Sequence, residues 1–254
     1  MTRFSANLGF LWTELTLPEA IRAAARAGFD AVECHWPYET PPEDVAAALS
    51  ETGLPMLGIN IRRGDVTAGD MGLSALAGRE NEARAAINEA VHYAAAIGAR
   101  CVHVMAGFAE GAAAGSVFER NLNYACDQAG QHGLTVLIEP LNPHDAPGYY
   151  LSSTDQAAEI IRSQGCSNLK LMFDCYHVQR AEGDVVRRLG ELLPIIGHIQ
   201  FAGAPDRGPP GQGELNYRYV FERLRQFGYD APLGAEYRPG GDTEASLGWM
   251  DMLK

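Results

Sequence analysis

The amino-acid sequence predicts one α/β domain over residues 1–254, folded as a single closed (β/α)8 TIM barrel. Apolar runs of strand length alternate with amphipathic runs of helical period along the whole chain. Eight such strand–helix pairs in 254 residues match the size of this barrel, and no linker or composition break divides them. A doubly wound sheet is the competing fold, but the chain has neither GxGxxG after its first strand nor GxxxxGK[ST].

The first half of the chain supplies four of the expected pairs. Thr16 is expected to cap the first helix, Pro18 to lie in its first turn, and Gly28 to end it. The expected strands are 4–12, 30–36, 55–61 and 101–107, and the expected helices are 16–28, 41–53, 75–98 and 116–133.

The second half supplies the other four pairs. The expected strands are 135–142, 169–177, 196–203 and 232–237, and the expected helices are 153–165, 184–194, 216–228 and 242–253. Residues 203–214 form a long loop rich in Gly and Pro, and loops of that length inside a compact domain usually have a function.

The bulk properties exclude several classes of protein. A net charge of −12 without a basic run argues against nucleic-acid binding through phosphates. The chain has no apolar window of about 18 residues and no signal-peptide pattern, so we expect neither a membrane segment nor export. Five cysteines without a CxxC pair indicate reduced thiols in a cytoplasmic protein. This composition and charge are also compatible with a homo-oligomer.

Oxygen-bearing side chains stand at the ends of the last four expected strands, each about one βα unit from the next. They are Glu139, Asp174, Gln200 and Glu236. The active site of such a barrel lies at these strand ends, and clustered carboxylates repel one another unless a cation lies between them. Hard cations such as Mg²⁺ and Mn²⁺ prefer oxygen ligands, so the pattern predicts a divalent-metal site. The alternative is that each acid is a solvated strand-end residue or a helix cap.

Several stretches carry a family resemblance. "IEPLN", "MFDCYH", "GHIQFAGAPDRGPPGQGELNY" and "GAEYRP", in this order and spacing, resemble the hydroxypyruvate isomerase family, as does the opening "LGFLWTELTLPEAIRAAARAGFDAVECHWPY". That family belongs to the xylose-isomerase-like TIM barrels, together with the ketohexose 3-epimerases. The resemblance runs over essentially the whole chain.

The resemblance implies roles for the four strand-end residues. All four match the family's metal ligands, and Glu139 and Glu236 also match its proton donor and acceptor pair. The related epimerases usually have His where this chain has Gln200. Within the resemblance, this difference favours the hydroxypyruvate isomerase branch. An amide oxygen suits Mg²⁺ better than an imidazole does, so Mg²⁺ is the first candidate metal and Mn²⁺ the second.

The implied reaction is an aldose–ketose type isomerisation of a small anionic hydroxy-oxo acid. Hydroxypyruvate would become 2-hydroxy-3-oxopropanoate through an enediolate, with a metal as Lewis acid and a glutamate as base. A 2-oxo-tetronate isomerase is the close alternative, a ketohexose 3-epimerase is a more distant one, and a small-acid binding protein is the alternative without catalysis.

Cations and histidines complete the expected site. Arg207, in the long loop, is the first candidate to bind the substrate carboxylate, and Arg62 is the second, because a planar guanidinium suits a carboxylate. His177, His103 and His35 are expected to line the substrate pocket. His198 lies two residues before Gln200 and is expected one layer deeper, as a hydrogen-bonded interior residue.

Two other enzyme classes that use this fold are disfavoured. A Schiff-base aldolase needs an interior lysine near the strand ends, whereas Lys170 begins a strand and Lys254 is the last residue. An endonuclease of the AP type uses several His and Asp ligands and binds DNA, which fits neither the oxygen ligands nor the acidic charge. Glu33, an ionisable residue in an apolar strand, is expected to be inward and hydrogen-bonded, and it has no assigned role.

Overall fold

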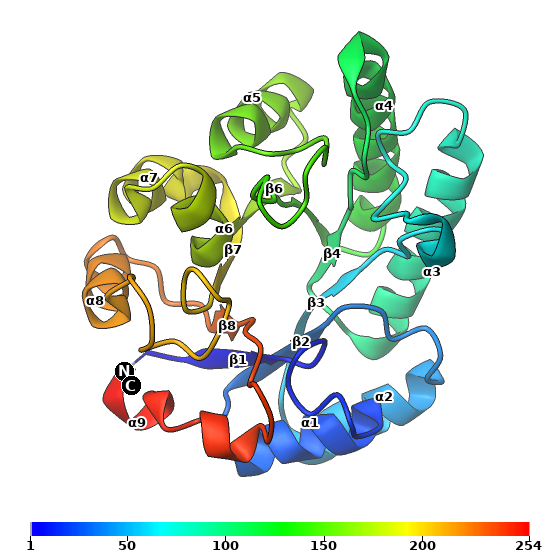
Figure 1. Cartoon of the computed structure of the whole chain (residues 1–254). Helices are drawn as coiled ribbons and strands as arrows, with labels where there is room; N and C mark the ends of the chain where they lie inside the picture. The colour runs from blue at the N-terminus through cyan, green and yellow to red at the C-terminus, as the bar shows by residue number, and fades with distance from the viewer. Residues whose placement is uncertain (1, 254) are drawn as a thin grey trace.

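Residues 2–253, which the computed structural model describes, form a closed barrel of eight parallel strands paired in chain order. Figure 1 looks into this central ring of strands. The strands are β1 (Phe4–Asn7), β2 (Ala31–Cys34), β3 (Met56–Asn60), β4 (Cys101–His103), β5 (Thr135–Ile138), β6 (Leu169–Asp174), β7 (Ile196–Phe201) and β8 (Leu233–Ala235). The barrel closes where Phe4 and Ala6 of β1 pair with Leu233 and Ala235 of β8. This arrangement confirms the predicted fold class.

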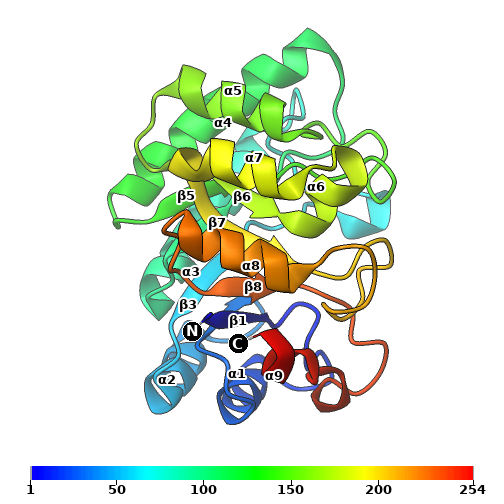
Figure 2. The ribbon, with the colours of Figure 1, turned by 90° about the vertical axis from the view of Figure 1, so that its left-hand side faces the viewer.

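Helices surround the barrel on the outside, which the perpendicular views of Figures 1 and 2 both show. They are α1 (Leu17–Arg26), α2 (Pro42–Thr52), α3 (Glu80–Ile97), α4 (Gly111–Gly130), α5 (Thr154–Gln164), α6 (Cys175–Ala181), α7 (Val185–Leu192), α8 (Tyr217–Gln226) and α9 (Trp249–Leu253), with short 3-10 turns at Val66–Ala68, Leu193–Ile195 and Glu244–Ser246. None of the described helices is both long enough and apolar enough to cross a bilayer.

Local sequence signals explain where the first helix begins. The Glu19 carboxylate accepts hydrogen bonds from the Thr16 backbone N–H at 3.0 Å and from its hydroxyl at 2.6 Å. Pro18 lies in the first turn, where its missing N–H costs nothing. The inward face of the helix buries Ile21 and small alanines against the barrel. The start predicted from Thr16 is therefore confirmed.

Two expected elements have different bounds, and in both cases a side chain turns the backbone. The strand expected at 169–177 ends at Asp174, because its carboxylate accepts the Tyr176 backbone N–H at 2.8 Å and caps α6. The strand expected at 4–12 ends at Asn7, whose side-chain oxygen accepts the Gly9 N–H at 2.9 Å and starts a turn.

Three expected helices also differ. The helix expected at 116–133 runs instead from Gly111 to Gly130. The helix expected at 75–98 begins only at Glu80. The region expected to form a helix at 242–253 instead contains a 3-10 turn and the short α9, which are separated by Leu247 and Gly248.

The main apolar core lies between the barrel and the helices. Phe201 of β7 packs edge-on against Phe221 of α8 at 5.0 Å between ring centroids and against Trp249 of α9 at 5.4 Å. A smaller cluster of Cys101, Leu137 and Met172 fills the barrel interior below the site. All five cysteines are free thiols, as their spacing indicated.

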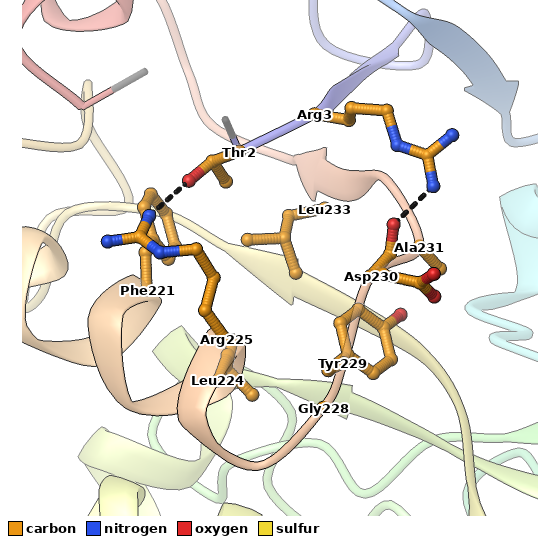
Figure 3. A pocket seen from close by; sticks show the side chains of 10 residues that line it. All are labelled: Thr2, Arg3, Phe221, Leu224, Arg225, Gly228, Tyr229, Asp230, Ala231 and Leu233. Carbon is orange, nitrogen blue, oxygen red and sulfur yellow. Dashed lines mark hydrogen bonds between the residues drawn. The ribbon is translucent and has the colours of Figure 1, made fainter.

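A pocket of about 280 Å³ lies at the amino ends of β1 and β8, the end of the barrel opposite the predicted site. Figure 3 shows Arg225 of α8 donating to the Thr2 hydroxyl and Arg3 donating to the Asp230 backbone carbonyl. These bonds tie the last helix–strand connection to the start of β1. Residues at this end of such a barrel typically serve stability.

Candidate active site

The four oxygen-bearing residues predicted from the strand ends all lie at the carboxyl ends of their strands. Glu139 directly follows β5, Asp174 ends β6, Gln200 lies near the end of β7, and Glu236 directly follows β8. Asp174 and Gln200 are paired across the β6–β7 ladder, and all four side chains are buried. The sheet therefore brings these side chains to one end of the barrel, within a region that excludes water.

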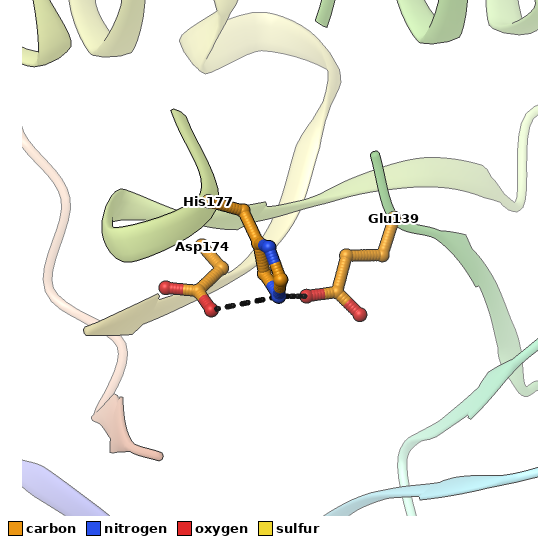
Figure 4. A group of neighbouring side chains, drawn as sticks. All are labelled: Glu139, Asp174 and His177. Atoms are coloured by element: carbon orange, nitrogen blue, oxygen red, sulfur yellow. Dashed lines mark ion pairs between the residues drawn. The ribbon is translucent and has the colours of Figure 1, made fainter. Parts of the chain in front are cut away.

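Glu139, Asp174 and His177 form a buried group in which one donor atom from each lies within 4.8 Å of the others. The His177 Nε2 atom lies 3.9 Å from Glu139 Oε1 and 3.7 Å from Asp174 Oδ2, as Figure 4 shows. The other ring nitrogen, Nδ1, accepts the Asn142 backbone N–H at 3.1 Å. A neutral His177 consequently carries its proton on Nε2 and points that proton at the two carboxylates.

The carboxylates differ in their electrostatic surroundings. Burial, followed by the charges of Glu236 and Asp174, raises the pKa of Glu139 well above its usual value. Burial likewise raises the pKa of Asp174 to about 7. At Glu236 burial acts in the same direction, but Arg207 and His35 outweigh it and lower the pKa to about 2. Glu139 is thus the acid that the protein's own cations stabilise least.

Arg207 is the cation that the long loop delivers to this cluster. Its Nη2 donates to Glu236 Oε2 at 2.5 Å and to Asp174 Oδ2 at 3.3 Å. The guanidinium lies between the rings of Phe10 and Tyr176, at 5.0 and 5.1 Å from their centroids. The position of this loop agrees with the functional role that its length and composition indicated.

Arg62, the second candidate cation, has partners elsewhere. It donates to Glu89 at 2.8 Å and to Glu39 at 3.1 Å, and it stacks on Tyr38. Its side chain is 43% exposed, whereas that of Arg207 is 13% exposed. Of the two arginines, the structure brings Arg207 to the buried carboxylates and pairs Arg62 with more exposed acids.

Two residues of the first half of the barrel contact Glu236. Asn7, at the end of β1, donates to Glu236 Oε1 at 3.1 Å, and His35 Nε2, just past β2, lies 2.8 Å from the same oxygen. Sequence reasoning assigned no role to Asn7 and treated His35 only as a pocket residue. A signal was present for His35, which comes at the end of an apolar strand as the four predicted ligands do, whereas Asn7 lay in the middle of the strand expected at 4–12.

His103, which ends β4, lies beside Glu139. Its Nδ1 donates to the Asn60 side-chain oxygen at 3.2 Å and lies 3.8 Å from Glu139 Oε2. Burial lowers the pKa of His103 to about 3, so the ring is neutral at ordinary pH. Burial has the same effect on His177, whose pKa is also about 3.

Below these residues, Glu33 of β2 collects three hydrogen bonds inside the barrel. Gln200 Nε2 donates to it at 2.8 Å and Asn7 Nδ2 at 3.1 Å, and His198 Nε2 lies 2.6 Å from its second oxygen. The inward, hydrogen-bonded positions expected for Glu33 and His198 are confirmed.

Of the two lysines, Lys170 lies where the sequence predicted. Lys170 is the second residue of β6, at the end of that strand far from the site, and its amine donates to the Pro194 carbonyl at 3.4 Å. Lys254 lies outside the described residues.

The donor atoms fit a hard divalent metal. Within residues 2–253, Glu139 Oε1 and Gln200 Oε1 are both buried and find no hydrogen-bond partner. Buried polar atoms are rarely left unsatisfied, and carboxylate and amide oxygens are ligands that Mg²⁺ and Mn²⁺ accept. The buried acids Glu139 and Asp174 are therefore able to contribute to a divalent-metal site.

A (β/α)8 barrel with a buried acidic group at its strand ends defines the chain as an enzyme-type TIM barrel. Residues 21–253 match the family described as xylose isomerase-like TIM barrel, and the chain belongs to that family. It is 44% identical to 2-oxo-tetronate isomerase of Cupriavidus necator, covering 98% of each chain. It is 38% identical to hydroxypyruvate isomerase of Escherichia coli, covering 99% of each.

A solved structure from Brucella melitensis, titled AP endonuclease, family 2, superposes with a TM-score of 0.95 at 38% identity, covering all of both chains. The curated relatives, which match over nearly the full length of the chain, are named as isomerases. The protein is accordingly an isomerase of this family.

Proposed function

We propose that the protein is a metal-dependent isomerase of small 2-oxo-3-hydroxy acids, with hydroxypyruvate and 2-hydroxy-3-oxopropanoate as its substrate pair. The observation that carries this proposal is the burial of Glu139, Asp174 and Glu236 at one end of the barrel, beside a single loop arginine. Clustered buried acids are costly unless they bind cations, and their position matches the active end of the fold. The isomerase names of the relatives support the reaction class.

The proposed metal ligands are Glu139, Asp174, Gln200 and Glu236, with Mg²⁺ as the first candidate and Mn²⁺ as the second. When bound, such a metal supplies Lewis acidity that polarises adjacent carbonyl and hydroxyl oxygens. His177 is excluded from this ligand set, because its Nδ1 accepts a backbone N–H and its Nε2 carries the ring proton.

Glu139 and Glu236 are proposed as the proton-transfer pair. One of them takes a proton from C3 of hydroxypyruvate, an enediolate forms, and a proton returns to C2 of the product. The hydroxyl and carbonyl oxygens exchange roles at the same time, so no external oxidant is needed. Their burial excludes bulk water from the carbanion-like intermediate.

Arg207 and His177 are proposed to bind the substrate. Arg207 Nε is buried and, among the described residues, has no hydrogen-bond partner, so the guanidinium keeps a donor available for a carboxylate. His177 directs an N–H at the same region. Arg62 is a weaker candidate than Arg207, because Glu39 and Glu89 already bind its guanidinium.

A four-carbon 2-oxo-tetronate is the second candidate substrate, and the relative from Cupriavidus necator favours it. The chemistry is the same, because the carbonyl moves between C2 and C3 in both acids. The two substrates differ only in the group attached to C3.

A substrate panel tests the proposal. The purified protein, loaded with Mg²⁺ or Mn²⁺, is offered hydroxypyruvate, a 2-oxo-tetronate and a neutral ketohexose, and the products are followed by proton NMR. We expect one of the two acids to be isomerised and the ketohexose to remain unchanged. Turnover of the ketohexose alone would identify an epimerase. Binding without turnover of any of the three would identify a small-acid binding protein.

A further inference from the structure

We propose that Glu33 is a positioning residue that holds the Gln200 amide with its oxygen toward the metal position. The inference rests on the proposed function, since it takes Gln200 as a metal ligand. Glu33 lies on β2, which β1 and β8 separate from β7 in the ring of strands, and its side chain crosses the interior to reach Gln200. It does not touch the proposed substrate, so its effect acts through Gln200.

The hydrogen bonds allow only one orientation of the Gln200 amide. Glu33 Oε1 accepts Gln200 Nε2 at 2.8 Å and Asn7 Nδ2 at 3.1 Å. If the amide were reversed, Gln200 Oε1 would face a carboxylate oxygen at the same short distance, and two acceptors would repel each other. The amide oxygen is therefore directed away from Glu33, and among residues 2–253 it has no other partner.

Glu33 itself is fixed in place. Its second oxygen lies 2.6 Å from His198 Nε2, so both oxygens of the carboxylate are engaged. Gly234 of β8 makes room for this pair, because a Cβ there would come within 2.7 Å of both Glu33 oxygens and 2.8 Å of His198 Nε2. Because His198, Asn7 and the β8 backbone at Gly234 confine the Glu33 carboxylate, it cannot rotate freely. It therefore fixes the orientation of the Gln200 amide that it binds.

This arrangement solves a problem that a glutamine ligand has and a carboxylate ligand lacks. The two oxygens of Glu139 or Asp174 are equivalent, so either can bind a cation. Gln200 offers one oxygen and one NH₂, and the neighbouring carboxylates attract the NH₂ end. Without Glu33 the amide would turn its nitrogen toward the acids, and an N–H donor cannot ligate a metal. Residues that orient metal ligands in this way typically change metal affinity 10- to 100-fold.

A cycle of three variants tests the inference: Glu33→Met, Gln200→Glu, and the two combined. Methionine has similar length but cannot accept the Gln200 N–H. The affinity of the full-length protein for Mn²⁺ is measured by isothermal titration calorimetry, with folding checked by circular dichroism. We expect Glu33→Met to weaken Mn²⁺ binding about 10- to 100-fold.

The combined variant carries the decisive result. Gln200→Glu alone places two carboxylates at hydrogen-bond distance, so it should also weaken binding about 10-fold or more. In the Glu33→Met background the same replacement supplies a ligand with two equivalent oxygens, which needs no orientation. Mn²⁺ affinity should then return to within about 5-fold of that of the unmodified protein, so the sign of the Gln200→Glu effect depends on residue 33.

Glu182→Met is the matched control. Glu182 accepts the Thr154 backbone N–H at 2.9 Å and pairs with Arg188 at 2.9 Å, so it is similarly engaged but lies between α5 and α7. It should lower thermal stability and leave Mn²⁺ affinity unchanged. Gly234→Ala, which keeps Glu33 but displaces it, should weaken Mn²⁺ binding as Glu33→Met does.

Unchanged Mn²⁺ affinity in Glu33→Met, or a combined variant that binds as weakly as the worse single one, would overturn the inference. A failure of the proposed function looks different, because the unmodified protein itself would then bind no Mn²⁺. If Glu33→Met fails to fold, Gly234→Ala still decides the question by the same titration.

Discussion

The two halves of the barrel contribute opposite chemistry to one site. The strand ends of β5 to β8 supply oxygen acceptors, whereas those of β1 to β4 supply mainly amide N–H groups and imidazoles. The acceptors are Glu139, Asp174, Gln200 and Glu236, and the residues opposite them are Asn7, His35, Asn60 and His103. The comparison indicates that the second half holds the proposed cation, while the first half fixes how the acids are oriented.

Arg207 and Glu33 are the two exceptions to this division. Arg207 brings a cation to the acidic half, where it binds Asp174 and Glu236. Glu33 brings an acceptor to the donor half, where it binds Asn7 and Gln200. Arg207 is thus the cation among the acceptors of the second half, and Glu33 is the acid among the donors of the first half, from which it reaches Gln200 in the second half.

The largest loss of activity should come from replacing the glutamates at the strand ends of β5 and β8. Replacing Glu139 or Glu236 by Gln keeps an oxygen ligand but removes the proposed base, so kcat on the isomerised acid should fall about 10²- to 10⁴-fold. The double variant should be little worse than the worse single one, because both act in one proton path. Near-full activity of both single variants with metal bound would assign the proton transfer to other residues, with His177 the first to examine.

A smaller effect is expected at the loop arginine. Arg207→Met should raise KM for the acid substrate about 10- to 100-fold, because a charge-assisted hydrogen bond of roughly 1.5–3 kcal/mol is lost. Arg62→Met is the control, since Arg62 is paired with Glu39 and Glu89 and should change KM less than about 2-fold. Steady-state kinetics of the two variants measures KM for the acid substrate. Equal KM values for Arg207→Met and Arg62→Met would reject Arg207 as the carboxylate-binding residue.

A still smaller loss of activity is expected from substitutions at the strand ends of β1 to β4. His35→Phe retains the ring contact with Phe10 but removes the hydrogen bond to Glu236. We expect kcat/KM to fall about 10-fold, with little change in the unfolding temperature. If the loss matched that of Glu236→Gln, the first half would carry chemistry of its own and not merely orient the acids.

The smallest effect on activity should come from the opposite end of the barrel. Arg225→Ala removes the hydrogen bond to Thr2, which joins α8 to the start of β1. Unfolding should be easier by about 0.5–1.5 kcal/mol, and kcat should be unchanged. Chemical denaturation and a kinetic assay on the same sample measure both quantities, and a clear drop in kcat would mean that the two ends are coupled.

Much of the fold followed from the sequence, because strand and helix periods are local and repeat along the chain. Element ends were harder to predict, and Asp174 shows why. An acid at a strand end and an acid at a helix N-cap look identical in sequence, and here one residue is both, so the strand ends before His177. The side chain of Asn7 ended the first strand in a similar way.

The site was predictable only where one strand end could be compared with the next. Glu139, Asp174, Gln200 and Glu236 stood out as a series of oxygen ligands. Glu33 did not, because its partners Gln200 and His198 lie more than 160 positions away in sequence and no local pattern reveals that contact. The choice between Arg62 and Arg207 likewise required knowing which acids each one meets.

Gly234 has a consequence for how this interior can change over mutational time. A side chain there would come within 2.7–2.8 Å of Glu33 and His198, so alanine displaces one of these side chains unless residue 33 or residue 198 has first become smaller. Because Glu33 also contacts Gln200, such a change would remove support from a proposed ligand before any gain could appear. The contacting interior residues of β2, β7 and β8 are therefore expected to change together, whereas residues of the surrounding loops can change by single substitutions.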